Sequence, residues 1–156
     1  MCSSDLSPDG KWLAYTGYDN KKMATQISRI YLMDLKTQKV QEVKTKLDRG
    51  VSSLSWSGDS KNIFFTYADK GNTKLAQTTL KGKNSILGNN LSRGYSVAKD
   101  GRFVFITTRP DLPSDLAVGR ASGGQTKTIT SVNSDLLTHK KRSEEHTSEL
   151  QSRAYL

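Results

Sequence analysis

One short pattern occurs three times in this sequence, and it constrains the fold more than any other feature. A turn that contains aspartate is followed by lysine or arginine and then by a run of aromatic and aliphatic residues. The three copies are SPDGKWLAY from Ser7, SGDSKNIFF from Ser57 and AKDGRFVFI from Ala98. A second strand-like segment follows each copy: RIYLMDL from Arg29, TKLAQTTL from Thr73 and SDLAVGRA from Ser114.

The spacing of the copies indicates the architecture. Their aspartates, Asp9, Asp59 and Asp100, lie 50 and 41 residues apart. Repeats of about 40–50 residues that each hold several strands are typical of β-propeller blades. No stretch of ten or more residues between Ser7 and Lys141 has helical periodicity. The sequence therefore predicts an all-β fold, a partial β-propeller of about three antiparallel four-stranded blades.

Local chemistry predicts a hairpin at each copy. In SPDG, Pro8 presets φ near −65°, Asp9 can accept hydrogen bonds from its own turn, and Gly10 can adopt a positive φ. Ser60 departs from the pattern, because glycine stands at that position in the other two copies. If the turn needs a left-handed residue there, serine costs about 1 kcal/mol or the turn changes type.

The strands on either side of these turns differ in pattern. Before the second copy, Leu54 and Trp56 alternate with Ser55, which predicts a strand with one buried face. After the turns, apolar residues are consecutive, which predicts strands buried on both faces, as between two neighbouring blades. These runs are Trp12–Tyr15, Ile63–Phe65 and Phe103–Ile106.

The two ends of the chain differ from the rest. RSEEHTSELQS, Arg142–Ser152, holds three of the four glutamates and reads as the translation of a common short-read sequencing adapter. Met1–Leu6 reads as the reverse complement of the same adapter, translated from a GTG start. We therefore predict that 1–6 and 142–156 are adapter-derived, with 142–156 irregular or disordered. The propeller then occupies 7–141 of a longer parent protein.

Charge and hydropathy restrict the possible partners. The formal net charge is +9, but lysine and arginine are spread through turns such as 20–23, 36–39 and 81–83, with no interleaved aromatic residues. This favours a solvated surface and no nucleic-acid partner. No apolar run reaches the roughly 18 residues of a membrane span, so we expect no membrane partner. The compartment, periplasmic or cytoplasmic, stays open.

Side chains with catalytic chemistry do not form a convincing set. Ser96 lies in a sequence like G-x-S-x-G, but a hairpin turn follows where a nucleophile elbow needs a helix. His139 is the only histidine in 7–141, and we expect it at the surface rather than in a triad with Asp135. Zinc needs cysteine and histidine ligands at short spacing, and 7–141 holds one histidine and no cysteine, so we expect no zinc site.

Three loops also fail as candidate sites. Asp69–Asn72 offers too few oxygen ligands for calcium. Gly119–Gly124 does not open a helix, as a phosphate cradle requires. Arg109–Pro113 is a turn with two prolines, and we expect its arginine to be solvated. The sequence thus predicts no catalytic, cofactor-binding or metal-binding residue, and no cofactor.

Longer segments carry a resemblance to a known family. Gly17–Thr37, Leu47–Ala76, RPDLPSDLAV from Arg109 and SDLLTHKK from Ser134 resemble, in this order, the non-catalytic propeller of prolyl-oligopeptidase-family serine peptidases. The acylaminoacyl-peptidase-like and dipeptidyl-peptidase-like members are the most similar. The resemblance implies a propeller that caps an α/β-hydrolase domain of the same parent chain and admits short peptide substrates. The catalytic residues lie on that domain, which is missing from this sequence, so the chain alone should be inactive.

An alternative interpretation stays open. SPDGK-type repeats are widespread, and a non-enzymatic periplasmic propeller of the Tol-complex type, which binds proteins, also has them. The sequence that follows Lys141 would separate the two, because a peptidase needs hydrolase-type sequence there and a binding propeller needs further blades. In either case we expect a three-blade fragment to be marginal or prone to aggregation, because its end blades have uncovered faces.

Overall fold

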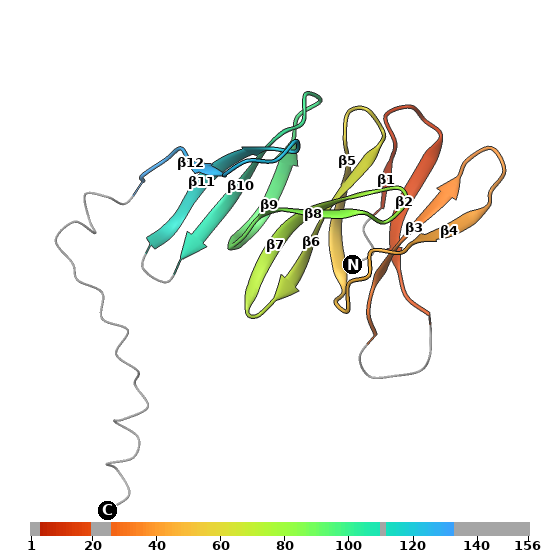
Figure 1. Cartoon of the computed structure of the whole chain (residues 1–156), viewed down its shortest axis with the longest axis horizontal. Coiled ribbons are helices and arrows are strands. Elements are labelled where there is room, and N and C mark those ends of the chain that lie inside the picture. The colour runs from red at the N-terminus through yellow and green to blue at the C-terminus, as the bar shows by residue number, and fades with distance from the viewer. Residues whose placement is uncertain (1–3, 20–25, 110–111, 133–156) are drawn as a thin grey trace, which may run out of the picture.

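The described part of the chain forms three four-stranded antiparallel sheets in succession (Figure 1). The computed structural model describes residues 4–19, 26–109 and 112–132, and these contain strands and turns but no helix. Blade 1 holds β1 (Ser4–Leu6), β2 (Trp12–Gly17), β3 (Arg29–Asp34) and β4 (Val40–Val43). Blade 2 holds β5 (Val51–Trp56), β6 (Asn62–Asp69), β7 (Asn72–Thr79) and β8 (Asn84–Gly88). Blade 3 holds β9 (Leu91–Val97), β10 (Arg102–Arg109), β11 (Leu112–Arg120) and β12 (Lys127–Thr128).

Within each blade the strands pair in chain order, and the three blades lie side by side. This confirms the predicted all-β fold and the partial propeller of about three blades. The predicted second strands RIYLMDL, TKLAQTTL and SDLAVGRA correspond to β3, β7 and β11. Because the described residues form no helix, none of them supplies a membrane-spanning helix.

Each Asp-containing turn joins the first and second strands of its blade, as predicted. The turns close through backbone hydrogen bonds from Ser7 to Trp12 (2.8 Å), from Ser57 to Asn62 (2.9 Å) and from Ala98 to Arg102 (2.7 Å). The third turn is thus one residue shorter than the other two. Strand pairing, and not distance from the aspartate, therefore defines which positions correspond in the three blades.

Two hydrophobic clusters fill the spaces between the blades. The first, between blades 1 and 2, is formed by Ala14, Ile30, Leu32, Val43, Val51, Leu54, Trp56, Ile63, Phe65, Tyr67 and Ala76. The second, between blades 2 and 3, is formed by Phe64, Leu75, Leu87, Leu91, Phe103, Phe105 and Ala117. Residues of β6 enter the two clusters alternately, because successive side chains of a strand point to opposite faces.

Burial on both faces is confirmed for one of the three predicted strands. Five consecutive residues of β6, Ile63 to Tyr67, are buried. In β2 and β10, by contrast, buried residues alternate with partly exposed ones. The prediction was wrong for these two strands, because each end blade packs against a single neighbour.

Ser4–Leu6, which the sequence interpretation left out of the fold, form the edge strand β1. They pair with β2 through Ser4–Tyr15, Asp5–Ala14 and Leu6–Leu13. Ladder pairing uses backbone groups that every non-proline residue carries. The pairing therefore does not depend on where the codons for these residues came from.

Candidate functional site

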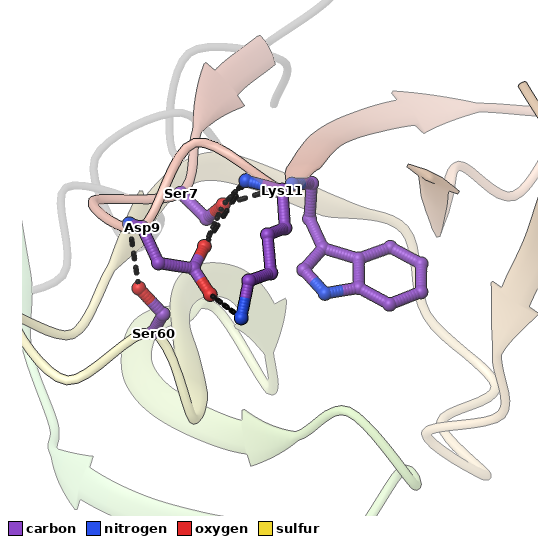
Figure 2. Close-up of polar contacts among 5 residues, drawn as sticks. Ser7, Asp9, Lys11 and Ser60 are labelled. Atoms are coloured by element: carbon purple, nitrogen blue, oxygen red, sulfur yellow. Dashed lines mark hydrogen bonds and ion pairs between the residues drawn. The ribbon is translucent and has the colours of Figure 1, made fainter. Parts of the chain in front are cut away.

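The turn of blade 1 is organised by two side chains, Ser7 and Asp9. The Ser7 hydroxyl donates to Asp9 Oδ1 (2.7 Å), and Ser7 Oγ accepts from the backbone N–H of Trp12 (2.9 Å). Asp9 Oδ1 also accepts from the Lys11 N–H (3.2 Å) (Figure 2). The Ser7 hydroxyl, and then the Lys11 N–H, lower the pKa of Asp9. Gly10 has φ of 68°, which agrees with the predicted left-handed position.

Blade 2 repeats this arrangement. The Ser57 hydroxyl donates to Asp59 Oδ1 (2.6 Å), and Ser57 Oγ accepts from the Asn62 N–H (2.9 Å). The Ser57 hydroxyl is the largest cause that lowers the pKa of Asp59. These carboxylates act as turn acceptors, and this explains why aspartate recurs in the repeats.

Blade 3 holds its shorter turn without a serine. Asp100 accepts from the Arg102 backbone N–H (3.1 Å) and from Arg102 Nε (2.7 Å). These contacts, the backbone N–H first, lower the pKa of Asp100. All three aspartates thus have a structural reason to be charged.

Ser60 connects two blades. It adopts the left-handed conformation that its position requires, with φ of 58°. Its Oγ accepts a hydrogen bond from the Asp9 backbone N–H (3.1 Å) (Figure 2). The departure from glycine therefore has a structural explanation that the sequence did not reveal.

Gly58 allows the next pair of turns to approach. A Cβ placed on Gly58 would lie 2.6 Å from the Lys99 carbonyl oxygen and 2.8 Å from its Cα. Pro8 and Lys99 occupy this second turn position in the other copies. The sequence did not reveal that Gly58 and Ser60 make contacts between turns, although glycine at the second rather than the fourth turn position was an available signal.

Polar contacts elsewhere also join the blades. The Trp56 backbone N–H donates to Asp5 Oδ2 (3.1 Å), and Trp56 Nε1 donates to the Asp5 carbonyl (3.0 Å). Gln77 Nε2 donates to the Ala121 carbonyl (2.7 Å). The Tyr95 hydroxyl donates to the Ser53 carbonyl, and burial raises the pKa of Tyr95.

Ser96 and Asp69, which were considered as chemical sites, lie in the described part of the chain. Ser96 is exposed on β9 and a strand follows its turn, as predicted. Asp69 accepts from Lys74 Nζ (2.6 Å) and lies 3.5 Å from Arg49 Nε, so it belongs to an ion-pair network. His139 and Asp135 lie outside the described residues, as do Pro110 and Asp111 of the proline-rich turn. Among residues 4–19, 26–109 and 112–132, no three potential metal ligands gather.

Strand pairing identifies two faces that correspond to buried interblade positions. Leu13, Ile63 and Phe103 are equivalent, because they pair with Leu6, Trp56 and Val97, respectively, the last residues of the first strands. The equivalents of any other residue follow from the register. In blade 2 nearly all of these positions are buried on both faces of the sheet, Gln77 being partly exposed, whereas the end blades bury one face each.

The first open face, termed the N-face, belongs to blade 1. It consists of Leu13, Tyr15, Tyr31 and Met33, which are all partly exposed. Their blade 2 equivalents by pairing are Ile63, Phe65, Ala76 and Thr78, each at most 1% exposed. The rings of Tyr15 and Tyr31 stack with centroids 5.6 Å apart. The N-face therefore has the composition of an interblade surface, and no other blade of the described residues lies against it.

The second open face, termed the C-face, belongs to blade 3. It consists of Val104, Ile106, Leu116 and Val118. Their blade 2 equivalents are Phe64, Thr66, Leu75 and Gln77, which lie against blade 3. Leu75 is fully buried, whereas Leu116 is 39% exposed.

A cavity of about 390 Å³ lies at the turn end of the C-face. Three cationic side chains contribute to its wall, which is formed by Arg102, Val118, Gly119, Arg120, Gly123, Gln125 and Lys127. Val118 is equivalent to Gln77, which contacts Ala121 of the following blade. The cavity therefore occupies the place where, in blade 2, a residue of the next blade sits.

These features define a class: the described part of the chain is a run of β-propeller blades, with blade contacts at the turns and, at each end, an interblade face that no other described blade covers. No family model matches the sequence. The chain is 30% identical over 137 residues to dipeptidyl-peptidase 5 of Porphyromonas gingivalis, across 85% of this chain and 20% of that protein. It thus spans about a fifth of the length of this relative.

Solved structures support the fold. The β-propeller domain of the trilobed protease of Pyrococcus furiosus matches 83% of this chain and 42% of its own, with a TM-score of 0.57 and 17% identity. TolB of Acinetobacter baumannii matches 85% of this chain and 33% of its own, with a TM-score of 0.61 and 22% identity. These structures show the β-propeller fold, and the similarity to dipeptidyl-peptidase 5 agrees with the predicted resemblance to a peptidase propeller.

Proposed function

We propose that this chain is part of a propeller domain that caps and gates the active site of a serine peptidase acting on short peptides. The open faces at both ends of the three blades carry this proposal, because they leave places for further blades in a longer parent. The sequence relative supports it, since its name describes a dipeptidyl peptidase. The catalytic residues would lie on an α/β-hydrolase domain of the parent chain.

The candidate site supports a scaffolding and gating task rather than chemistry. Asp9 and Asp59 are held as acceptors within turns, and the hydroxyls of Ser7 and Ser57 donate to them. A nucleophilic serine would instead need a base within hydrogen-bond reach. We expect the chain alone to give no hydrolysis of dipeptide-based chromogenic substrates above the buffer rate. Hydrolysis that purifies with the chain and is lost in Ser96→Ala would contradict this.

Sequencing the source DNA outward from the codons for Ser7 and Lys141 tests the proposal directly. A downstream reading frame that reaches G-x-S-x-G and then spaced aspartate and histidine would support a peptidase. The same reads test the ends of the chain. If the natural frame encodes RSEEHTSELQS after Lys141, the adapter interpretation is wrong.

A protein-binding propeller is the second candidate, and the fold similarity to TolB favours it. It predicts that the frame continues through more blades to a stop codon without hydrolase sequence. That result would replace the peptidase proposal, because fold alone does not determine function.

A further inference from the structure

We propose that the N-face and the C-face bind each other between copies of this chain, so that blade 3 of one copy packs on blade 1 of the next. In the isolated chain the occupant of each open face is thus a second copy of the same chain, at the place that a further blade would take in a longer parent. This inference concerns the chain as it stands and does not depend on the activity of a parent protein.

The two interfaces inside the chain provide the template. Blade 2 presents Ile63 and Phe65 to blade 1, and it presents Phe64 and Leu75 to blade 3. The N-face holds the positions equivalent to those that blade 2 presents to blade 1, and the C-face holds those equivalent to the ones it presents to blade 3. Both faces are rich in apolar side chains, and seven of their eight blade 2 equivalents are at most 6% exposed, Gln77 being the exception. Bringing the faces together would remove this area from water, which is favourable.

A protruding side chain and a cavity mark the two ends. Leu80 and Ala121 directly follow β7 and β11, and each packs against the cluster on the side of the preceding blade. Leu35 holds the equivalent position after β3 and is 38% exposed. The cavity beside Val118 is where the equivalent residue of a following blade would sit. In the proposed contact, Leu35 of one copy would therefore enter the cavity of another.

The contact is heterologous, since it joins two different faces. Such contacts close into rings when the rotation permits and otherwise continue as filaments. Propellers typically have four to eight blades, so two copies of three blades fall within the range of closed rings. A closed pair would leave neither face exposed, and we expect it to be the main species.

Light scattering coupled to size exclusion tests the association. The 17.3 kDa chain should elute as a dimer at micromolar concentration. Leu35→Arg places a cation opposite the cationic cavity, and Leu116→Glu places a charge in the C-face. Each variant alone should weaken association by about tenfold or more. Ile86→Glu is the matched control, because Ile86 is 58% exposed on β8 of blade 2, away from both open faces.

Mixing the two variants distinguishes this arrangement from other dimers. Leu35→Arg keeps an intact C-face and Leu116→Glu keeps an intact N-face, so an equimolar mixture should recover a heterodimer. If the unsubstituted chain is monomeric at 100 μM, the proposal is overturned. Association that neither variant weakens, or that the mixture of folded variants fails to restore, would also overturn it.

If either variant fails to fold, cross-linking of the unmodified chain followed by mass spectrometry tests the same arrangement. It should map contacts between blade 1 and blade 3 of different copies, and contacts found only elsewhere would contradict the proposal.

Discussion

The backbone N–H of Asp9 donates to the Oγ of Ser60 over 3.1 Å, and these two residues belong to corresponding turns of neighbouring blades. Ser60 is buried, with 9% of its surface exposed. The Ser60 side chain thus accepts from the Asp9 backbone N–H, which has no hydrogen-bond acceptor within its own turn. The left-handed strain at Ser60 is the cost of this contact, and the connection between blades is its benefit.

Substitutions at Ser60 should separate this benefit from its cost. Ser60→Ala loses the hydrogen bond and keeps the strain, so it should destabilise the fold by about 1 kcal/mol. Ser60→Gly loses the hydrogen bond but relieves backbone strain of similar size, so its unfolding free energy should stay near that of the unsubstituted chain. Urea unfolding of both variants, with the exposed Ser85→Ala as control, measures the difference. Equal stability of the two variants would contradict this account.

Gly58 offers a test of turn-to-turn packing without a positive φ. Gly58→Ala places a Cβ against the backbone of Lys99, and overpacking of this kind costs roughly 1–3 kcal/mol. Gly94 is the matched control, because a Cβ there meets nothing within 4 Å. Gly94→Ala should be neutral or slightly stabilising. Thermal unfolding of the two variants should therefore differ in sign or clearly in size.

The sequence was sufficient to predict the blades and hairpins, because turn chemistry acts over a few residues. Asp9 and Gly10 determine their own turn, whatever lies next to it. The contact between Asp9 and Ser60 joins residues 51 positions apart, so local chemistry could not reveal it. In the sequence, Ser60 is only a departure from the repeat, whereas in the structure it connects two copies of the repeat.

Burial of the strands was only partly predictable for a similar reason. The apolar runs in β2, β6 and β10 have the same pattern, yet only β6 is buried on both faces. A strand face is buried only when a second sheet covers it. The pattern therefore indicates which faces can be covered, and the number of blades in the chain decides which ones are.

Acid should destabilise the chain through its turn aspartates. Hydrogen bonds lower the pKa values of Asp9, Asp34, Asp59 and Asp100 in the fold. Lowered pKa values in the folded state add stability that is present above the unfolded pKa, which is about 3.9. That stability is lost as the pH falls through the lower folded values. Unfolding midpoints should be insensitive to these groups above pH 5 and should fall below pH 4.

Ser57→Ala should alter one of these titrations selectively. The Ser57 hydroxyl is the first cause of the lowered pKa of Asp59, so this variant should raise the Asp59 pKa towards its ordinary value. Asp100 has no such hydroxyl partner and should titrate as before. Carboxyl ¹³C chemical shifts followed against pH measure both groups in one sample. An unchanged Asp59 titration would refute the assigned cause.

The hydrogen bonds between Trp56 and Asp5 should make the short edge strand β1 contribute to the stability of the fold. Asp5→Ala removes the carboxylate that accepts from the Trp56 backbone N–H, and an unpaired buried donor costs about 1–3 kcal/mol. Asp5→Asn keeps an acceptor oxygen and should retain more of the stability. Chemical denaturation of both variants checks this order, and the reverse order would count against a structural contribution from Asp5.

Leu75 and Leu116 allow the state of the open C-face to be measured. They are equivalent by strand pairing, yet Leu75 is fully buried and Leu116 is 39% exposed. Leu75→Ala should cost about 2–5 kcal/mol, as core leucines do. In dilute solution, where the chain is monomeric, Leu116→Ala should cost about 1 kcal/mol or less, because its side chain already contacts water.

As protein concentration rises and copies associate, the cost at Leu116 should increase while that at Leu75 stays constant. A cost at Leu116 that is independent of concentration would mean that no second copy covers this face, whereas a concentration-dependent one would link the stability of the fold to the association of its blades.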